Sequence, residues 1–207
     1  MDQQLIPREL LCSTLSVSEC AAETVVVAEG TVNSAASALD WLWQHVGLVY
    51  SAADWDSAMQ DSDSDSVPFF INRLTATGSP DWLPAGDSAF SRDSTSALEA
   101  VAVLESIVFS VQRNIDCLAR VKVADRIFLS GGLSQIEAFC QCLADLSGMP
   151  VWRSDDVEAC ARGAAMQLLP AMNNQHSCRQ YTPKTRSYLS SRYRQWSAAM
   201  DQLRCSG

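Results

Sequence analysis

Short apolar runs alternate with longer amphipathic segments along this chain of 207 residues. Two apolar, partly β-branched stretches, residues 10–17 and 24–32, predict strands joined by a turn. Residues 33–47 then place alanine, leucine and valine on one helical face, with Gly47 as the stop signal. A further strand is predicted over residues 67–71. This alternation of strands and helices is typical of an α/β fold with helices on both faces of a mixed sheet.

The longest helical pattern covers residues 94–120. Ser94 is placed to cap this helix, and apolar residues recur on one wide face as far as Leu118. Glu105 lies within that apolar face, where an unpaired carboxylate would be costly. We therefore expect Glu105 to make a hydrogen bond that anchors the helix, in preference to a catalytic role.

Residues 127–129 form a short apolar run that ends at the glycine pair Gly131-Gly132. A run of this length bounded by glycines is typical of a buried parallel strand. An amphipathic helical pattern follows, and Ser134 and Glu137 have the spacing of a capping box at its start. The sequence therefore predicts a strand, a glycine turn and a helix capped by Ser134.

The end of this helix is marked by Gly148, and another strand begins at Val151. A helix with a small-residue core follows at residues 161–165. The chain turns polar after Pro170.

The turn at Gly131-Gly132 has two interpretations. Glycine can serve there only for its backbone dihedral angles, as in many turns between a strand and a helix. Alternatively, the absence of a Cβ allows a ligand to lie directly against the backbone, close to the N–H groups and partial positive charge of a helix N-terminus. Ligands of α/β sheets bind in the crevice beyond the strand ends, where this turn would lie.

The formal net charge of the chain is −9 at pH 7. This charge argues against nucleic acid or an anionic membrane as a partner, because both need a basic surface. No apolar run is long enough to span a bilayer, and the first residues lack the basic start and apolar core of a signal peptide. We therefore expect a cytoplasmic protein with no membrane partner.

Eight cysteines are spread over the chain, several of them on apolar helix faces. This distribution predicts reduced thiols that act as small core residues. With only two histidines, His45 and His176, and no Cys-x-x-Cys pair, no metal site is predicted. The acidic run at residues 61–66 is interpreted as a solvated loop. Calcium binding there stays open as an alternative, although the EF-hand spacing is missing.

Taken in order, these segments resemble the C-terminal domain of the FGGY family of carbohydrate kinases, with the glycerol kinases as the most similar members. The resemblance covers residues 10–196, and the order and spacing of several short segments carry it. These segments are Ala28-Glu29-Gly30, Leu39-Asp40-Trp41-Leu42, Gly78-Ser79-Pro80-Asp81-Trp82, Leu104-Glu105-Ser106-Ile107, the strand at 127–129, Gly131-Gly132, Asp145-x-x-Gly148, Pro150-Val151 and Ala161-Arg162-Gly163-Ala164-Ala165.

The resemblance implies a ribonuclease H-like, or actin-like ATPase, domain with a mixed sheet and helices on both faces. Residues 1–170 would form the nucleotide-binding domain, partial at its start because the first hairpin of the family is missing from this chain. Residues 171–207 would form a loop and a helix packed on that domain.

The resemblance also implies a nucleotide site. The adenosine would lie against Gly131, Gly132, Leu133 and Ile136, and the helix at residues 33–47 would face it with Ala36 and Asp40. No catalytic residue is assigned. The general base of the family lies in a Gly-Asp-Gln segment, and Asp2-Gln3-Gln4 has no glycine before it.

The loop at Gly78–Trp82 departs from the family pattern. Family members continue with acidic and basic residues, whereas Leu83-Pro84-Ala85-Gly86 follows here. The loop has two interpretations: it keeps the role that it has in the kinases, or it is a turn anchored by one buried tryptophan, Trp82.

For function, the resemblance implies the adenosine-binding half of a kinase that uses ATP with Mg²⁺ to phosphorylate a sugar or polyol hydroxyl. The alternative is a non-catalytic remnant that binds a nucleotide weakly or serves as a protein-interaction module. Without the first hairpin, the strand at residues 10–17 would keep an unpaired edge. We therefore expect as partners, besides the nucleotide, a separate or missing N-terminal kinase domain or a homodimer mate.

Overall fold

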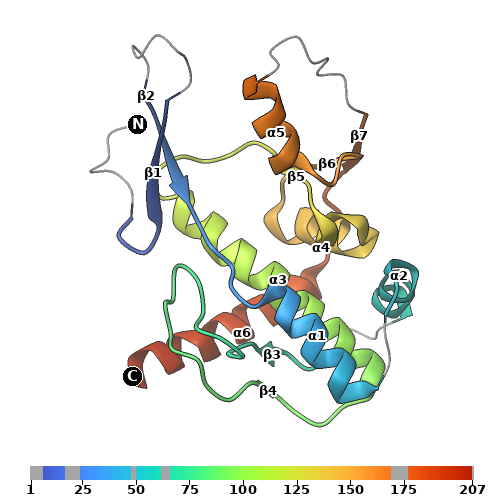
Figure 1. The fold of residues 1–207 in the computed structure, drawn as a ribbon. Coiled ribbons are helices and arrows are strands. Elements are labelled where there is room, and N and C mark those ends of the chain that lie inside the picture. The colour runs from blue at the N-terminus through green and yellow to red at the C-terminus, as the bar shows by residue number, and fades with distance from the viewer. Residues whose placement is uncertain (1–6, 17–23, 48–49, 62–65, 169–176, 207) are drawn as a thin grey trace.

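The computed structural model describes residues 7–16, 24–47, 50–61, 66–168 and 177–206 (Figure 1). Asp2, the predicted turn at residues 18–22, most of the acidic run at 61–66 and Pro170 lie outside these residues.

The strands form three small sheets. β1 (Leu11–Ser16) and β2 (Thr24–Glu29) are antiparallel, with Leu11 opposite Glu29 and Ser16 opposite Thr24. A second antiparallel pair is much shorter and consists of β3 (Phe70–Ile71) and β4 (Ala89–Phe90). The predicted strands at 24–32 and 67–71 are therefore shorter in the structure than the apolar runs suggested.

The third sheet has the order β5-β6-β7. β5 (Ile127–Leu129) runs parallel to β6 (Val151–Ser154), and β7 (Cys178–Tyr181) is antiparallel to β6. The sheet is therefore mixed, as predicted. In Figure 1 it lies between α4 (Glu137–Ser147) and α5 (Ala159–Leu168).

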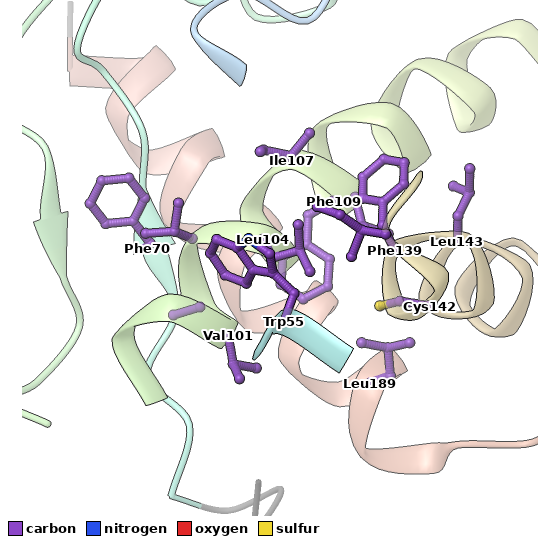
Figure 2. Packing of buried hydrophobic residues seen from close by; sticks show 14 of the residues in the cluster. Trp55, Phe70, Val101, Leu104, Ile107, Phe109, Phe139, Cys142, Leu143 and Leu189 are labelled. Atoms are coloured by element: carbon purple, nitrogen blue, oxygen red, sulfur yellow. The ribbon is translucent and has the colours of Figure 1, made fainter. Parts of the chain in front are cut away.

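The core surrounds α3 (Ser96–Leu118). Ten consecutive residues of this helix, 100–109, are buried, and none of them is more than 2% exposed. The other helices that pack on α3 are α1 (Ala35–Val46), α2 (Ala52–Asp61), α4 and α6 (Ser187–Ser206). Figure 2 shows Trp55, Phe139 and Leu189, from three of these helices, around the side chains of α3. Burying one such leucine or phenylalanine contributes about 1.5–3 kcal/mol.

The structure supplies the hydrogen-bond partner that we expected for Glu105, and it is Arg192 of α6. The Arg192 Nε donates to Glu105 Oε2 at 2.9 Å, and Nη2 donates to the other carboxylate oxygen. Both side chains are buried, which joins the C-terminal helix to the centre of α3 by an ion pair. Burial raises the pKa of Glu105, and the positive charge of Arg192 opposes that rise. The expectation of an anchoring hydrogen bond is confirmed.

Two predicted helix starts are wrong. α3 begins at Ser96 with Thr95 as its N-cap, so Ser94 lies just before the cap. Ser134 does not cap α4, because it lies inside a short 3₁₀ turn, η2 (Gly132–Gln135), and its hydroxyl donates to Gly131 O at 2.6 Å. The helix then begins only at Glu137. The two helix ends that were predicted at glycines are correct, since Gly47 and Gly148 are both left-handed C-caps, whereas α3 ends at Leu118, two residues before the predicted end.

Candidate functional site

The glycine turn between β5 and η2 has an open backbone. Gly131 has a φ of 93°, which a residue with a Cβ rarely adopts. A Cβ built on Gly131 or on Gly132 would meet no atom within 4 Å. The backbone of the turn therefore faces free space that a ligand could enter, and Gly132 is exposed to it.

The two apolar residues predicted at this site differ in exposure. Leu133 is half-buried, whereas Ile136 is only 7% exposed and belongs to the hydrophobic core. The Ile136 N–H donates to Leu133 O at 3.2 Å, which closes the 3₁₀ turn before α4. Ile136 therefore fixes the shape of the turn, and little of its side chain can face a ligand.

A carboxylate from another helix caps the start of α4. Asp56 of α2 accepts a hydrogen bond from the Ala138 N–H through Oδ1 at 2.6 Å. This contact satisfies one of the N–H groups that a helix N-terminus leaves unpaired. It also places a negative charge there, so this end of α4 is less suited to an anionic ligand than an uncapped helix N-terminus would be. An uncharged adenosine at the preceding turn meets no such obstacle.

Ala36 and Asp40 are both exposed on α1. The start of α1 is held by the chain after β3, since Asn72 Nδ2 donates to Ser34 O at 3.2 Å and Asn33 Nδ2 donates to Ala76 O at 3.1 Å. α1 and α4 both pack on α3, so one helix positions both halves of the predicted site. Within the described ranges, no hydrogen bond or ion pair joins Ala36 or Asp40 to the glycine turn.

The loop at residues 78–83 forms an ion pair with α3, between Asp81 and Arg113, that was not predicted from the sequence. A Cβ on Gly78 would lie 2.1 Å from Thr31 O. Only glycine therefore lets the backbone of the loop come so close to the chain just after β2. Asp81 accepts hydrogen bonds from Arg113 Nε at 3.0 Å and from Arg113 Nη2 at 2.6 Å. Trp82 is 46% exposed, so the interpretation of a turn anchored by one buried tryptophan is wrong.

Arg113 also joins this loop to the C-terminal helix. Its Nη1 donates to Ser197 Oγ at 2.5 Å and its Nη2 to Asp201 at 2.7 Å. Burial alone would lower the pKa of Arg113, but its hydrogen bonds to Asp81 and Asp201 outweigh burial and raise it. No local sequence motif predicts this network, because its other members lie 32 to 88 positions from Arg113 in the sequence.

No group of three histidine, cysteine, aspartate or glutamate side chains in the described part of the chain could hold a metal ion. The six cysteines whose side chains are described are all free, three of them buried and three exposed. Among the described residues, none of the helices has the length and apolar character needed to cross a membrane.

Comparison with protein families gives one match for the chain. The family described as "FGGY family of carbohydrate kinases, C-terminal domain" matches residues 2–172. A glycerol kinase of Synechocystis sp. is 31% identical over 142 residues, which is 66% of this chain and 29% of that protein. A glycerol kinase of Geobacter sp. strain M21 is 34% identical over 146 residues, again 66% of this chain and 29% of that protein. The chain thus spans under a third of the length of these relatives.

Solved structures of sugar and polyol kinases share the fold. The crystal structure of Plasmodium falciparum glycerol kinase with ADP gives a TM-score of 0.77 at 15% identity, covering 94% of this chain and 42% of that one. Gluconate kinase from Lactobacillus acidophilus gives 0.74 at 18% identity, covering 96% of this chain and 43% of that one. This likeness confirms the predicted ribonuclease H-like α/β fold.

Proposed function

The chain belongs to the FGGY family of carbohydrate kinases, and on this premise we propose that it supplies the adenosine-binding half of an ATP-dependent kinase for a sugar or polyol hydroxyl. The observation that carries the proposal is the open backbone at Gly131-Gly132, where a Cβ would fill the space that an adenosine needs. In this proposal Leu133 and Ile136 shape the turn, and Ala36 and Asp40 line the opposite side.

ATP would bring the phosphoryl group and, with Mg²⁺, the charge neutralisation that its transfer requires. Mg²⁺ is commonly held by nucleotide phosphates and one or two carboxylates, so its contact with this chain would run through ATP. The residues of this chain bind and orient the adenosine. The general base that accepts the proton of the acceptor hydroxyl is not assigned to any residue here, and the complete reaction needs a further domain.

The same proposal covers the organisation of the chain. Residues 1–170 would form the nucleotide-binding domain, and residues 171–207 would pack on it through α6. The free cysteines are compatible with the reducing cytoplasm, where we place the protein.

The experiment that tests the nucleotide site is the substitution Gly132→Val. Gly132 has no positive φ, and a Cβ at this position meets open space, so the fold can accept valine. Gly163 of α5 also meets open space and has no positive φ, which makes Gly163→Val a matched control. We expect fluorescent ATP to bind the native chain and Gly163→Val, and to bind Gly132→Val at least about tenfold more weakly. Equal binding by all three would place the nucleotide elsewhere.

A second candidate function, a protein-interaction module, is favoured by the open sheet edges. Within the described ranges, β1 pairs only with β2, and β5 pairs only with β6. One edge of each strand therefore presents N–H and C=O groups to solvent. Phe128 of β5 is 70% exposed, so an apolar side chain stands beside the second of these edges. An N-terminal kinase domain or a second copy of the chain would cover them.

A further inference from the structure

A cavity separate from the glycine turn lies against α4. It has a volume of about 520 Å³ and is bounded by α2, α4, β7 and the segment that leads to α6. Figure 1 shows α2 beside α4, with β7 at the edge of the sheet above. None of the six residues proposed for the adenosine lines this cavity. Its size is within the range of about 300–1,000 Å³ that small-molecule sites occupy.

Three basic residues, Arg179, Lys184 and Arg186, line the cavity. Lys184 is held through its backbone, since its N–H donates to Asp145 Oδ1 at 2.7 Å. Its ammonium group has no hydrogen bond or ion pair within the described part of the chain. Arg179 lies with its guanidinium carbon 5.4 Å from the centre of the Tyr181 ring and forms an ion pair with Glu137.

The pair of Arg179 and Glu137 is weak enough to rearrange. The two side chains are 53% and 43% exposed, and ion pairs at such positions contribute about 0–1 kcal/mol. A stronger anion could therefore replace Glu137 on the guanidinium at little cost. Arg186, in contrast, is committed to the fold, because it contacts Asp145 at 2.8 Å and donates to the Tyr188 hydroxyl at 2.8 Å.

Carboxylates and neutral groups line the rest of the cavity. Asp56 caps α4 through one oxygen, which leaves its other oxygen as an acceptor. Glu137, once displaced from Arg179, would be a second acceptor beside it. The walls between them come from Met59, Ala138 and Tyr181. A hydroxyl group can donate to either carboxylate, and a carbon skeleton can lie on the apolar wall.

From this lining we infer that the cavity binds a small hydroxylated anion, a phosphate ester or a carboxylate, with its charge between Arg179 and Lys184. The contacts of the charged side chains in the lining favour an anionic ligand over a cationic one. Both carboxylates are already engaged, Asp56 by a helix N–H and Glu137 by an arginine, whereas the ammonium of Lys184 has no counter-charge among the described contacts. The hydroxyl groups of the ligand would then donate to Asp56 and Glu137.

The loop after β7 is built to keep Lys184 in place. Gln141 Nε2 donates to Thr182 O at 2.9 Å and to Asp145 Oδ1 at 2.7 Å. The same carboxylate oxygen also accepts the Lys184 N–H. The backbone of Lys184 is therefore fixed before any ligand arrives, and on binding only its side chain loses conformational freedom.

Calorimetric titration of the native chain with glucose 6-phosphate, gluconate, inorganic phosphate and glucose tests the inference. We expect saturable binding of glucose 6-phosphate or gluconate, weaker binding of phosphate and none of glucose. The first two ligands distinguish a phosphate ester from a carboxylate. Absence of binding by both would overturn the inference, and equal affinities for phosphate and glucose 6-phosphate would overturn the role given to the two carboxylates.

Substitutions locate the binding. Arg179→Gln and Lys184→Gln should each weaken it at least about tenfold, since each removes a charge-assisted hydrogen bond. Arg126→Gln is the matched control, because Arg126 is 52% exposed and also paired with one carboxylate, Asp125. Equal loss in the control would mean a general charge effect. Gly132→Val should leave this binding unchanged, and a loss there would place the ligand at the glycine turn instead.

Discussion

Replacing Arg192 by methionine would leave Glu105 as an unpaired carboxylate at the centre of the core. The Glu105 side chain is 2% exposed and that of Arg192 9%, so water cannot solvate the remaining charge without opening the packing between α3 and α6. Removing one partner of a buried ion pair costs about 3–5 kcal/mol. Arg194, exposed on the same helix, is the matched control, and Arg194→Met should change stability by at most about 0.5 kcal/mol.

The pH dependence of this loss gives a second measurement. Burial raises the pKa of Glu105 above its ordinary value. In Arg192→Met the charge and hydrogen bonds of Arg192, which oppose that rise in the native chain, are lost. The folded state then binds a proton more tightly than the unfolded state. Stability therefore increases as pH falls through the folded pKa, and the gain is complete below the unfolded pKa. The deficit of Arg192→Met should accordingly shrink between neutral pH and the ordinary range of a carboxyl group.

Urea unfolding of the native chain, Arg192→Met and Arg194→Met at several pH values provides the assay. The double variant Glu105→Gln with Arg192→Met should recover part of the loss, because an amide is cheaper to bury than a charge. A loss in Arg192→Met no larger than in Arg194→Met, or one that does not change with pH, would refute the reasoning.

Three further outcomes are expected. Asp56→Ala should lower the free energy of unfolding by about 1 kcal/mol in urea titrations, because α4 loses its cap. Arg113→Met should cost about 3–5 kcal/mol by the same measurement, since Asp81 stays buried without its partner, and a loss below 1 kcal/mol would contradict that. Sedimentation at tens of micromolar should show association of the chain, and Phe128→Glu should weaken it. Amide exchange in Leu11–Ser16 should be rapid. A monomer in which those amides are protected would mean that the open edges are covered within the chain.

Local signals in the sequence predicted most elements of the fold. The apolar face of the long helix, the two C-cap glycines and the run before Gly131 each depend on neighbours a few residues away, so periodicity and turn chemistry identify them. The same signals predicted that Glu105 needs a partner, although they could not name Arg192. Burial can be predicted from a pattern, whereas a pairing across 87 residues depends on the fold.

The errors share a physical cause. A serine at the start of a helical pattern can donate to a nearby carbonyl or accept from a helix N–H, and the sequence does not say which contact wins. Ser134 donates to Gly131 O, and Asp56, 82 residues from Ala138 in the sequence, caps the helix in its place by accepting the Ala138 N–H. The sequence could likewise propose Gly131 and Gly132 for a ligand, but it could not show that Ile136 turns into the core.

The C-terminal helix is where the sequence was least informative and the structure adds most. α6 follows a polar segment, and only the family resemblance implied a helix packed on the domain. Instead its side chains contact the core at three separate points. Arg192 neutralises Glu105, Asp201 and Ser197 hold the arginine that fixes the loop at residues 78–83, and Trp196 Nε1 donates to Phe70 O at 2.9 Å.

These three contacts have a consequence for the proposed division at residue 170. Removing α6 would leave Glu105 buried without a counter-charge, release one side of the Arg113 network and uncover β3. Two of these losses affect residues that are buried in the folded chain, Glu105 and Phe70. We therefore propose that residues 171–207 unfold together with the nucleotide-binding domain as one cooperative unit. A chain ending before α6 should fail to show a cooperative urea transition, whereas a sharp transition with native helix content would show that α6 is only an addition to a domain that is stable without it.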